Sequence, residues 1–161
     1  MKILVFSDSH GKGKNISSAI ELHKKSCDLV VFLGDGLSDI DYLKSLYPEL
    51  TFFAVKGNCD FFTGGTSNLE SVLDLDGIKV LITHGHRYGV KSGVGTILKR
   101  AHELDADAVF FGHTHTPYDD ILDIGEKRIH LFNPGSIGYG GTYGVVNTSG
   151  RVLVTSHTKI Q

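Results

Sequence analysis

Residues 2–10 read KILVFSDSH, a short apolar run that ends on two metal-binding side chains, Asp8 and His10. Runs of this length that are rich in Val, Ile, Leu and Phe predict β-strands. Four later runs also lead into residues that can bind a metal, and they cover 29–33, 51–55, 78–83 and 108–111. In an open α/β sheet, ligands bind in the crevice outside the carboxyl ends of the strands. We therefore expect the five run ends to meet at one site.

The residues that follow the five runs are carboxylates, imidazoles and one amide. They are Asp8, His10, Asp35, Asn58, Asp60, His84, His86, His113 and His115. A single charge pair does not need so many ligands, whereas two divalent cations do. Asp35 is the natural bridge between two ions because a carboxylate offers two acceptor oxygens. The amide oxygen of Asn58 suits a metal site in which its NH₂ group also donates to a substrate oxygen.

The mixture of nitrogen and oxygen donors restricts the metal. Imidazole suits Mn, Fe, Ni, Co or Zn, whereas an all-oxygen site would indicate Mg or Ca. We expect two divalent ions and favour Mn, with Ni, Fe, Co or Zn as the alternatives. The remaining histidines lie away from the run ends and are interpreted as structural: His23, His102, His130 and His157. His86 is interpreted either as a contact of the substrate or as a residue that supports a ligand.

The bulk properties restrict the class of protein. A chain of 161 residues fits one domain over 1–161, and its net charge of −2 argues against extended nucleic-acid binding. The net charge does not exclude a small phosphoester as the substrate, because bound metals add positive charge. Cys27 and Cys59 give no disulfide framework, so we expect a reducing, cytoplasmic location. The short apolar run at the start predicts no signal peptide, and no apolar stretch approaches the ~20 residues that span a membrane.

Helical periodicity follows three of the runs, and hairpin signals dominate the second half. Apolar residues repeat at helical spacing over 16–23, 40–47 and 94–101, with Ile40, Leu43, Leu46 and Tyr47 on the second predicted face. Turn sequences at 76–77, 125–126 and 148–150 separate pairs of strand-like runs. The order predicts a mostly parallel first sheet, an antiparallel second sheet and helices outside. We expect a flexible loop beside the site over 61–68.

Five motifs occur in a fixed order along the chain: Asp8-Ser9-His10, Gly34-Asp35, Gly57-Asn58-Cys59-Asp60, Thr83-His84-Gly85-His86 and Gly112-His113-Thr114-His115. Together they resemble the ordered motif set of the calcineurin-like metallophosphoesterase superfamily. The short length, Cys59 and the sequence Asn-Pro-Gly-Ser at 133–136 resemble its small YfcE-like phosphodiesterase branch.

The resemblance implies a fold, a set of ligands and an activity. The fold is a four-layer α/β/β/α sandwich of two mixed β-sheets flanked by helices. Carried over motif by motif, one ion is held by Asp8, His10, Asp35 and His115. The other is held by Asp35, Asn58, His84 and His113, so that Asp35 bridges them. The implied activity is that of a metal-dependent phosphodiesterase acting on a small phosphodiester through a water activated by both ions.

One motif departs from the superfamily pattern and bears on the reaction. Much of the superfamily has His at the position of Cys59, where it assists the leaving group, so phosphodiester hydrolysis is more plausible here than phosphomonoester hydrolysis. We place Asn58, Cys59 and Asp60 in the catalytic machinery, with Asp60 as an orienting group. Relatives also carry Arg soon after Asn-Pro-Gly-Ser, whereas Ile-Gly-Tyr-Gly-Gly follows at 137–141. The alternative function is a non-catalytic scaffold for protein interaction, and a homo-oligomer is left open.

Overall fold

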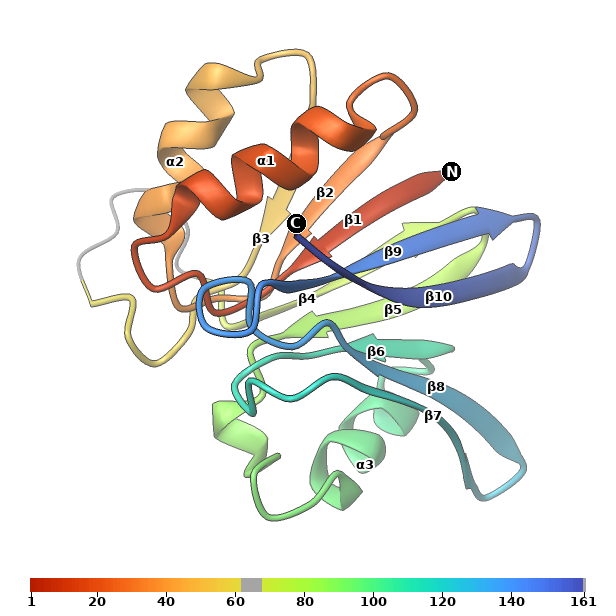
Figure 1. Cartoon of the computed structure of the whole chain (residues 1–161). Coiled ribbons are helices and arrows are strands. Elements are labelled where there is room, and N and C mark those ends of the chain that lie inside the picture. Colours follow the sequence, from red (N-terminus) through yellow and green to blue (C-terminus); the bar gives the residue numbers. More distant parts are fainter. Residues whose placement is uncertain (62–67, 161) are drawn as a thin grey trace.

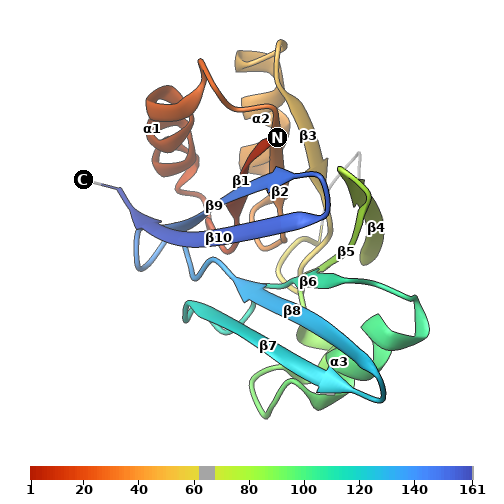
Figure 2. The ribbon, with the colours of Figure 1, turned by 90° about the vertical axis from the view of Figure 1, so that its right-hand side faces the viewer.

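The computed structural model describes residues 1–61 and 68–160, which form two stacked β-sheets with helices on both outer faces. Helices α1 (Gly13–His23) and α2 (Leu37–Leu46) cover the first sheet, and α3 (Gly95–Glu103) covers the second (Figure 1). Figure 2 shows the two stacked sheets from another side, with α1 and α2 beside the first sheet and α3 beside the second. The predicted four-layer α/β/β/α sandwich is confirmed.

The first sheet has the strand order β10-β9-β1-β2-β3. Strands β1 (Lys2–Phe6), β2 (Leu29–Phe32) and β3 (Thr51–Ala54) are parallel. Strands β9 (Thr142–Ser149) and β10 (Val152–Lys159) form a hairpin that pairs antiparallel with β1. The first sheet is therefore mixed, because a carboxyl-terminal hairpin completes it.

The second sheet has the order β4-β5-β6-β8-β7 and is also mixed. Its three inner strands, β5 (Ile78–Thr83), β6 (Ala108–Phe110) and β8 (Lys127–Asn133), are parallel. The edge strands β4 (Glu70–Leu75) and β7 (Tyr118–Ile124) are antiparallel. The expectation of an antiparallel second sheet is wrong, because the connection through α3 makes β5 and β6 parallel.

Three apolar cores hold the four layers together. The core between the sheets includes Val5 and Val31 from the first sheet and Ile82 and Phe110 from the second. A second core lies between α1, α2 and the first sheet, and a third lies between α3 and the second sheet. Burial of apolar surface on both faces of each sheet is what the near-continuous apolar sequence of the parallel strands predicts.

The predicted helix faces are largely correct. Ile16, Ala19 and Ile20 of α1 are buried, as expected from their spacing. In α2 the predicted face is wrong at Leu46, which is 49% exposed, whereas Tyr47 just beyond the helix is buried. Leu46 is six residues after Ile40, so the helical period turns it away from the face of Ile40 and Leu43, whereas a position seven residues on returns to that face.

The hairpin turns follow the sequence signals with one exception. Asp76 and Gly77 both have positive φ, 55° and 81°, as a type I′ turn requires. The predicted position of the last turn is wrong: Ser149 pairs with Val152, so the turn lies at 150–151 and not at 148–150. A loop is expected over 61–68, and residues 62–67 of that segment lie outside the described residues. No helix among the residues described is long and apolar enough to cross a bilayer.

Candidate metal centre

The ends of five strands bring the predicted ligands into three overlapping groups. In each group, one donor atom per residue lies within 4.8 Å of the others. The groups are Asp8, His10 and His115; Asp35, His84 and His113; and His10, Asp35 and Cys59. Strands β1, β2 and β3 of the first sheet and β5 and β6 of the second lead into these residues. The parallel strands therefore place side chains from distant parts of the sequence at one end of the sandwich.

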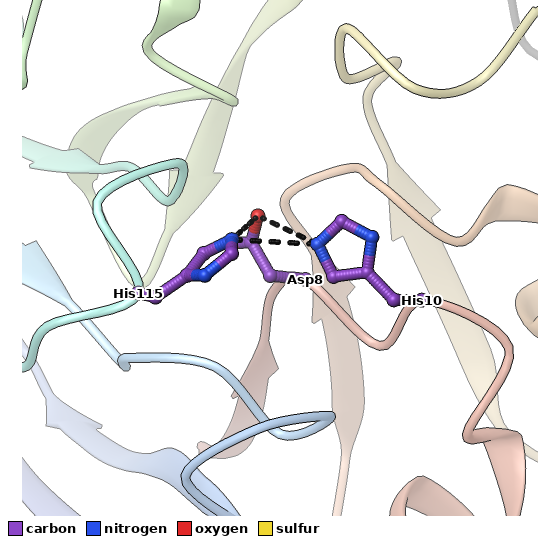
Figure 3. A group of neighbouring side chains, drawn as sticks. All are labelled: Asp8, His10 and His115. Carbon is purple, nitrogen blue, oxygen red and sulfur yellow. Dashed lines mark hydrogen bonds and ion pairs between the residues drawn. The ribbon is translucent and has the colours of Figure 1, made fainter.

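Asp8, His10 and His115 form a triangle of donor atoms (Figure 3). His115 Nε2 lies 3.1 Å from Asp8 Oδ1, and His10 Nε2 lies 3.8 Å from the same oxygen. The two imidazole nitrogens lie 3.3 Å apart. Two imidazole nitrogens and a carboxylate oxygen that face one point provide a three-ligand pocket for a cation.

Asp35 faces this triangle and also the second group of ligands. Its Oδ2 atom lies 3.4 Å from His84 Nε2 and 3.9 Å from His10 Nε2. His84 Nε2 also lies 3.1 Å from the amide oxygen of Asn58, which brings the predicted amide into the second group. The carboxylate of Asp35 therefore occupies the position between the groups that a bridging ligand needs.

The donor set fits two divalent cations of the Mn, Fe, Co, Ni or Zn type. Asp8 is fully buried and Asp35 is 3% exposed, yet within residues 1–61 and 68–160 neither carboxylate pairs with Lys or Arg. Buried carboxylates are costly unless a cation compensates them. The imidazoles around them are mixed with oxygen donors, which is the chemistry these metals prefer.

The ionisation of the site follows from burial and charge. Burial disfavours the charged forms of both Asp35 and His84, but their mutual attraction outweighs it. The pKa of Asp35 is therefore lowered, and the pKa of His84 is raised by Asp35 and Asp8. Burial, and then the neighbouring charge of His84, lower the pKa of His113 to about 4. An uncharged imidazole is the form in which His binds a metal.

The backbone at the ligands is strained. Five of the seven non-glycine residues with positive φ in the described chain are candidate ligands. They are Asp8, His10, Asp35, His113 and His115, with φ between 46° and 68°. Such φ values are uncommon for residues with a side chain, and they cluster at functional sites because the surrounding structure maintains them. The positive φ values therefore occur at the same positions that the side-chain chemistry marks as candidate ligands.

Asp60 organises the loop that presents Asp35. Its carboxylate, 6% exposed, accepts backbone N–H hydrogen bonds from Asp35, Gly36 and Leu37 at 2.8–2.9 Å, and from Gly57 at 2.9 Å. All of these donors belong to backbone amides, so the side chain faces the loop. The placement supports the predicted orienting role.

Gly34 and Gly57 allow the two loops to approach closely. A Cβ atom on Gly34 would lie 2.6 Å from the backbone nitrogen of Gly57, and the φ of Gly34 is 98°. A Cβ atom on Gly57 would overlap Asp35. Close packing thus requires glycine at both positions, and the left-handed backbone requires it at Gly34 as well.

Cys59 lies beside the candidate ligands. Its Sγ atom belongs to the group with His10 and Asp35, and its backbone N–H donates to Asp35 Oδ1 at 2.7 Å. The Asn58 amide nitrogen donates to this sulfur at 3.3 Å. Burial and the negative charge of Asp35 raise the pKa of the thiol. Its proximity to His10 depends on the path of two loops, which no local signal reveals.

His86 packs beside the second group. Its ring centroid lies 5.3 Å from that of His84 and 6.1 Å from that of His113. Its Nδ1 atom is buried and has no hydrogen-bond partner in the described part of the chain. Burial, followed by the charge of His84, lowers its pKa. The proximity fits the expected supporting or substrate-binding role, which stays a prediction.

The histidines interpreted as structural make other contacts. His23 Nε2 lies 3.0 Å from the Tyr143 hydroxyl, and His130 Nε2 lies 2.6 Å from Asp119 Oδ1. His157 Nε2 lies 2.7 Å from the carbonyl oxygen of Asn133. None of these rings, nor that of His102, belongs to a ligand group formed by the described residues.

The loop after Asn-Pro-Gly-Ser packs on the first metal-binding motif. Ser136 Oγ donates to the carbonyl oxygen of Asp8 at 2.8 Å, and Gly138 N–H donates to the same oxygen at 3.1 Å. The ring of Tyr139, which sequence reasoning did not single out, stacks on His115 with centroids 5.2 Å apart. The signal available in the sequence was an aromatic residue in the 137–141 segment.

Comparisons with known proteins agree with this geometry. The calcineurin-like phosphoesterase superfamily domain matches residues 1–151. The probable metallophosphoesterase YsnB of Bacillus subtilis is 36% identical over 138 residues, which are 85% of this chain and 75% of that protein. A phosphodiesterase of Methanocaldococcus jannaschii is 28% identical over 153 residues, with 84% of this chain and 83% of that protein covered. The structure of a predicted phosphoesterase from Streptococcus pneumoniae has a TM-score of 0.77 at 26% identity and covers 98% of this chain and 88% of that one.

The stacked mixed sheets and the cluster of nitrogen and oxygen donors are features that this protein shares with the metallophosphoesterases. The chain belongs to the calcineurin-like phosphoesterase superfamily. The family resemblance seen in the ordered motifs is thereby confirmed. The roles of the individual ligands and the identity of the metal stay predictions.

Proposed function

We propose that this protein is a metal-dependent phosphodiesterase that hydrolyses a small phosphodiester. The observation that carries the proposal is Asp35, whose carboxylate faces both ligand groups at 3.4 and 3.9 Å. One carboxylate between two sets of imidazoles fits two ions that share a ligand. When bound, two divalent ions supply Lewis-acid activation of a water nucleophile and neutralise charge on the phosphoryl oxygens. Mn²⁺ is the ion we favour for the mixed donor set.

The ligands divide between the two ions as the family motifs indicate. Asp8, His10 and His115 hold one ion, and His84, His113 and Asn58 hold the other. His84 is fixed for this role because its Nδ1 atom lies 2.7 Å from the carbonyl oxygen of Leu33. A hydrogen bond at the second ring nitrogen sets the tautomer and orientation of a metal-binding histidine.

The remaining polar groups of the chain orient the substrate and its ligands. Asn58 places its amide oxygen toward His84 and its nitrogen toward Cys59, so the NH₂ group is available at the centre for a phosphoryl oxygen. Asp60 holds the loop of Asp35 in place through backbone amides. Burial and the charge of Asp35 raise the pKa of the Cys59 thiol in the metal-free protein, and a thiol is a weak hydrogen-bond donor.

Phosphodiesters are favoured over phosphomonoesters because the centre lacks a strong proton donor at the third motif. A thiol is a poorer acid than an imidazolium for protonating a departing oxygen. The related phosphodiesterase of Methanocaldococcus jannaschii supports the same substrate class at 28% identity. The scaffold alternative is less favoured, because a non-catalytic protein has no need to keep buried carboxylates and strained imidazoles together.

The test is hydrolysis of bis(4-nitrophenyl) phosphate and 4-nitrophenyl phosphate by metal-free protein, with and without Mn²⁺. We expect diester hydrolysis to depend on added Mn²⁺, to be lost in chelator and to exceed monoester hydrolysis. Asp35→Asn should weaken the binding of both ions and abolish turnover, whereas Asp41→Asn on the exposed face of α2 should change neither. Undiminished activity in chelator, with metal shown to be absent, would refute the proposed mechanism. So would full metal content and activity in Asp35→Asn.

A further inference from the structure

Among the described residues, three of the four proposed histidine ligands, His10, His113 and His115, lack the hydrogen bond that usually orients a metal-binding histidine. Such a ring normally donates its second N–H to a carbonyl, carboxylate or water. His84 lies within hydrogen-bond distance of Leu33 in this way, and His113 packs edge-on against His84 at 5.0 Å between ring centroids. No such bond is present at the second nitrogen of His10 or His115 among the described residues. These two side chains are also 21% and 36% exposed, so burial does not fix them.

An exposed tyrosine packs against both of these rings. The ring of Tyr139 is stacked on His115, with centroids 5.2 Å apart and an angle of 26° between the planes. It also lies 5.1 Å from the ring of His10 at an angle of 49°. Tyr139 is nevertheless 67% exposed, which is unusual for a residue that serves only to fill a core. Its hydroxyl makes no hydrogen bond in residues 1–61 and 68–160, so the ring itself makes the contact.

Hydrogen bonds fix the backbone around Tyr139. Its backbone N–H donates to Ser136 Oγ at 3.0 Å, and that hydroxyl donates to the carbonyl oxygen of Asp8. The Lys12 ammonium donates to the carbonyl oxygen of Gly138 at 2.8 Å and lies 5.2 Å from the centre of the Tyr139 ring. A cation at this distance from an aromatic ring is attracted to it. The loop is therefore fixed to the same backbone segment that presents Asp8 and His10.

We propose that Tyr139 is a positioning residue for the ion held by Asp8, His10 and His115, which we call the first ion. Its ring orients His10 and His115, whose second nitrogens have no hydrogen bond to the described residues that would do so. The ring limits the rotation of both imidazoles, and so it keeps their Nε2 atoms 3.3 Å apart and aimed at Asp8. This role rests on the proposed two-metal centre. It predicts that loss of the ring weakens the binding of the first ion. The binding of the second ion, held by His84, His113 and Asn58, should be unchanged.

The experiment is a Mn²⁺ titration of metal-free protein, in which free Mn²⁺ is counted by electron paramagnetic resonance. We expect two ions to bind to the wild type. In Tyr139→Ala, one of the two should bind about 10–100-fold more weakly, the range found when groups that support ligands are removed. Tyr139→Phe keeps the ring and should restore wild-type affinity. Tyr42→Ala is the matched control, because Tyr42 is 66% exposed on α2 and away from the site.

The outcomes separate this inference from the proposed function. A wild type that binds two ions together with a Tyr139→Ala variant of equal affinity at both sites would overturn the role of Tyr139 alone. Equal weakening of both sites would also overturn it, since a general structural role predicts that result. A wild type that binds fewer than two ions would remove the two-metal centre and this inference with it. Circular dichroism verifies folding, and Tyr139→Leu replaces the alanine variant if the latter unfolds.

Discussion

At the scale of single residues, Cys59 is the position where the third motif differs from the superfamily pattern that the motifs resemble. The thiol lies among the ligands, but burial and the charge of Asp35 oppose its ionisation. It is therefore poorly suited to act as a nucleophile and weak as a proton donor. Substrates with acidic leaving groups need little protonation, whereas alkyl esters need it most.

We expect Cys59→Ala to leave the hydrolysis of aryl diesters largely intact. Cys59→His should raise activity preferentially on alkyl esters, since general acid catalysis contributes about 10²–10⁴-fold where the leaving group is poor. Both variants are to be measured on an aryl and an alkyl ester series with metal content determined in parallel. Loss of aryl activity in Cys59→Ala at full metal occupancy would show that the thiol takes part in the reaction. A destabilised Cys59→His variant would instead indicate a packing role.

At the scale of secondary-structure elements, Asp60 connects the loop between β2 and α2 to the end of β3. One carboxylate accepts four backbone N–H groups from these two segments. Hydrogen bonds to a charged group contribute about 1.5–3 kcal/mol each, and a buried donor left unpaired is costly. The position of Asp35 therefore depends on a residue whose carboxylate binds backbone amides.

We expect Asp60→Asn to destabilise metal-free protein by about 3 kcal/mol, because the amide NH₂ group replaces an acceptor and faces N–H donors. The affinity for Mn²⁺ should fall as well, since the loop of Asp35 loses its support. Urea unfolding and Mn²⁺ titration measure the two effects, with Asp41→Asn as the control. Wild-type stability together with wild-type Mn²⁺ affinity would show that the loop does not depend on this carboxylate.

Glu70 connects β4 to α3 in a similar way. It accepts hydrogen bonds from Tyr88 and from Arg100, whose Nε atom lies 3.2 Å from Glu70 Oε1. Burial raises the pKa of Glu70, but the bonds from Arg100 and Tyr88 outweigh it, so the pKa lies below its usual value of 4.5. Folding then favours the ionised form, and this stabilisation is complete above pH 4.5 and is lost as the pH falls through the lowered pKa.

We therefore expect Glu70→Gln to be less stable than the wild type at pH 6–7, with a difference that shrinks as the pH falls below about 4.5. Thermal unfolding of both proteins in chelator, over pH 3–7, measures this difference without a contribution from metal. Glu103→Gln is the matched control, because Glu103 lies 3.7 Å from the same arginine and is 50% exposed. A difference that does not vary with pH would assign the effect to packing.

At the scale of the whole molecule, the candidate centre joins the two sheets. Asp8, His10 and Asp35 follow strands of the first sheet, whereas His84, His113 and His115 follow strands of the second. Apolar contacts between the sheets end at this edge, where the buried groups are carboxylates and imidazoles. Ions bound there are expected to link the layers.

We expect Mn²⁺ at 100 times its dissociation constant to stabilise the folded protein by about 2.7 kcal/mol, or roughly 5–10 °C in Tm. A ligand that binds only the folded state has this effect by mass action. Differential scanning calorimetry at several Mn²⁺ concentrations measures it, and Asp35→Asn should show little or no shift. A Tm that is independent of Mn²⁺ in the wild type would argue against ions between the sheets.

The sequence predicted those features that depend on local pattern. The five strands, three helices and type I′ turn follow from periodicity, and the crevice rule places Asp8, Asp35 and His84 together. The sheet to which the hairpin at 142–159 belongs was not predictable, because pairing with β1 joins distant segments. The contact of Tyr139 with His115 and the proximity of Cys59 to His10 likewise depend on loop paths.

The positive φ angles at five candidate ligands imply a trade-off between stability and activity. Each such residue costs of order 1 kcal/mol relative to a relaxed backbone, and glycine adopts the same angles without that cost. A variant such as His113→Gly would relax the backbone at φ 68° while it removes a proposed ligand. Selection for thermal stability alone would therefore favour the loss of ligands, and the strained residues persist only where binding and turnover are also required.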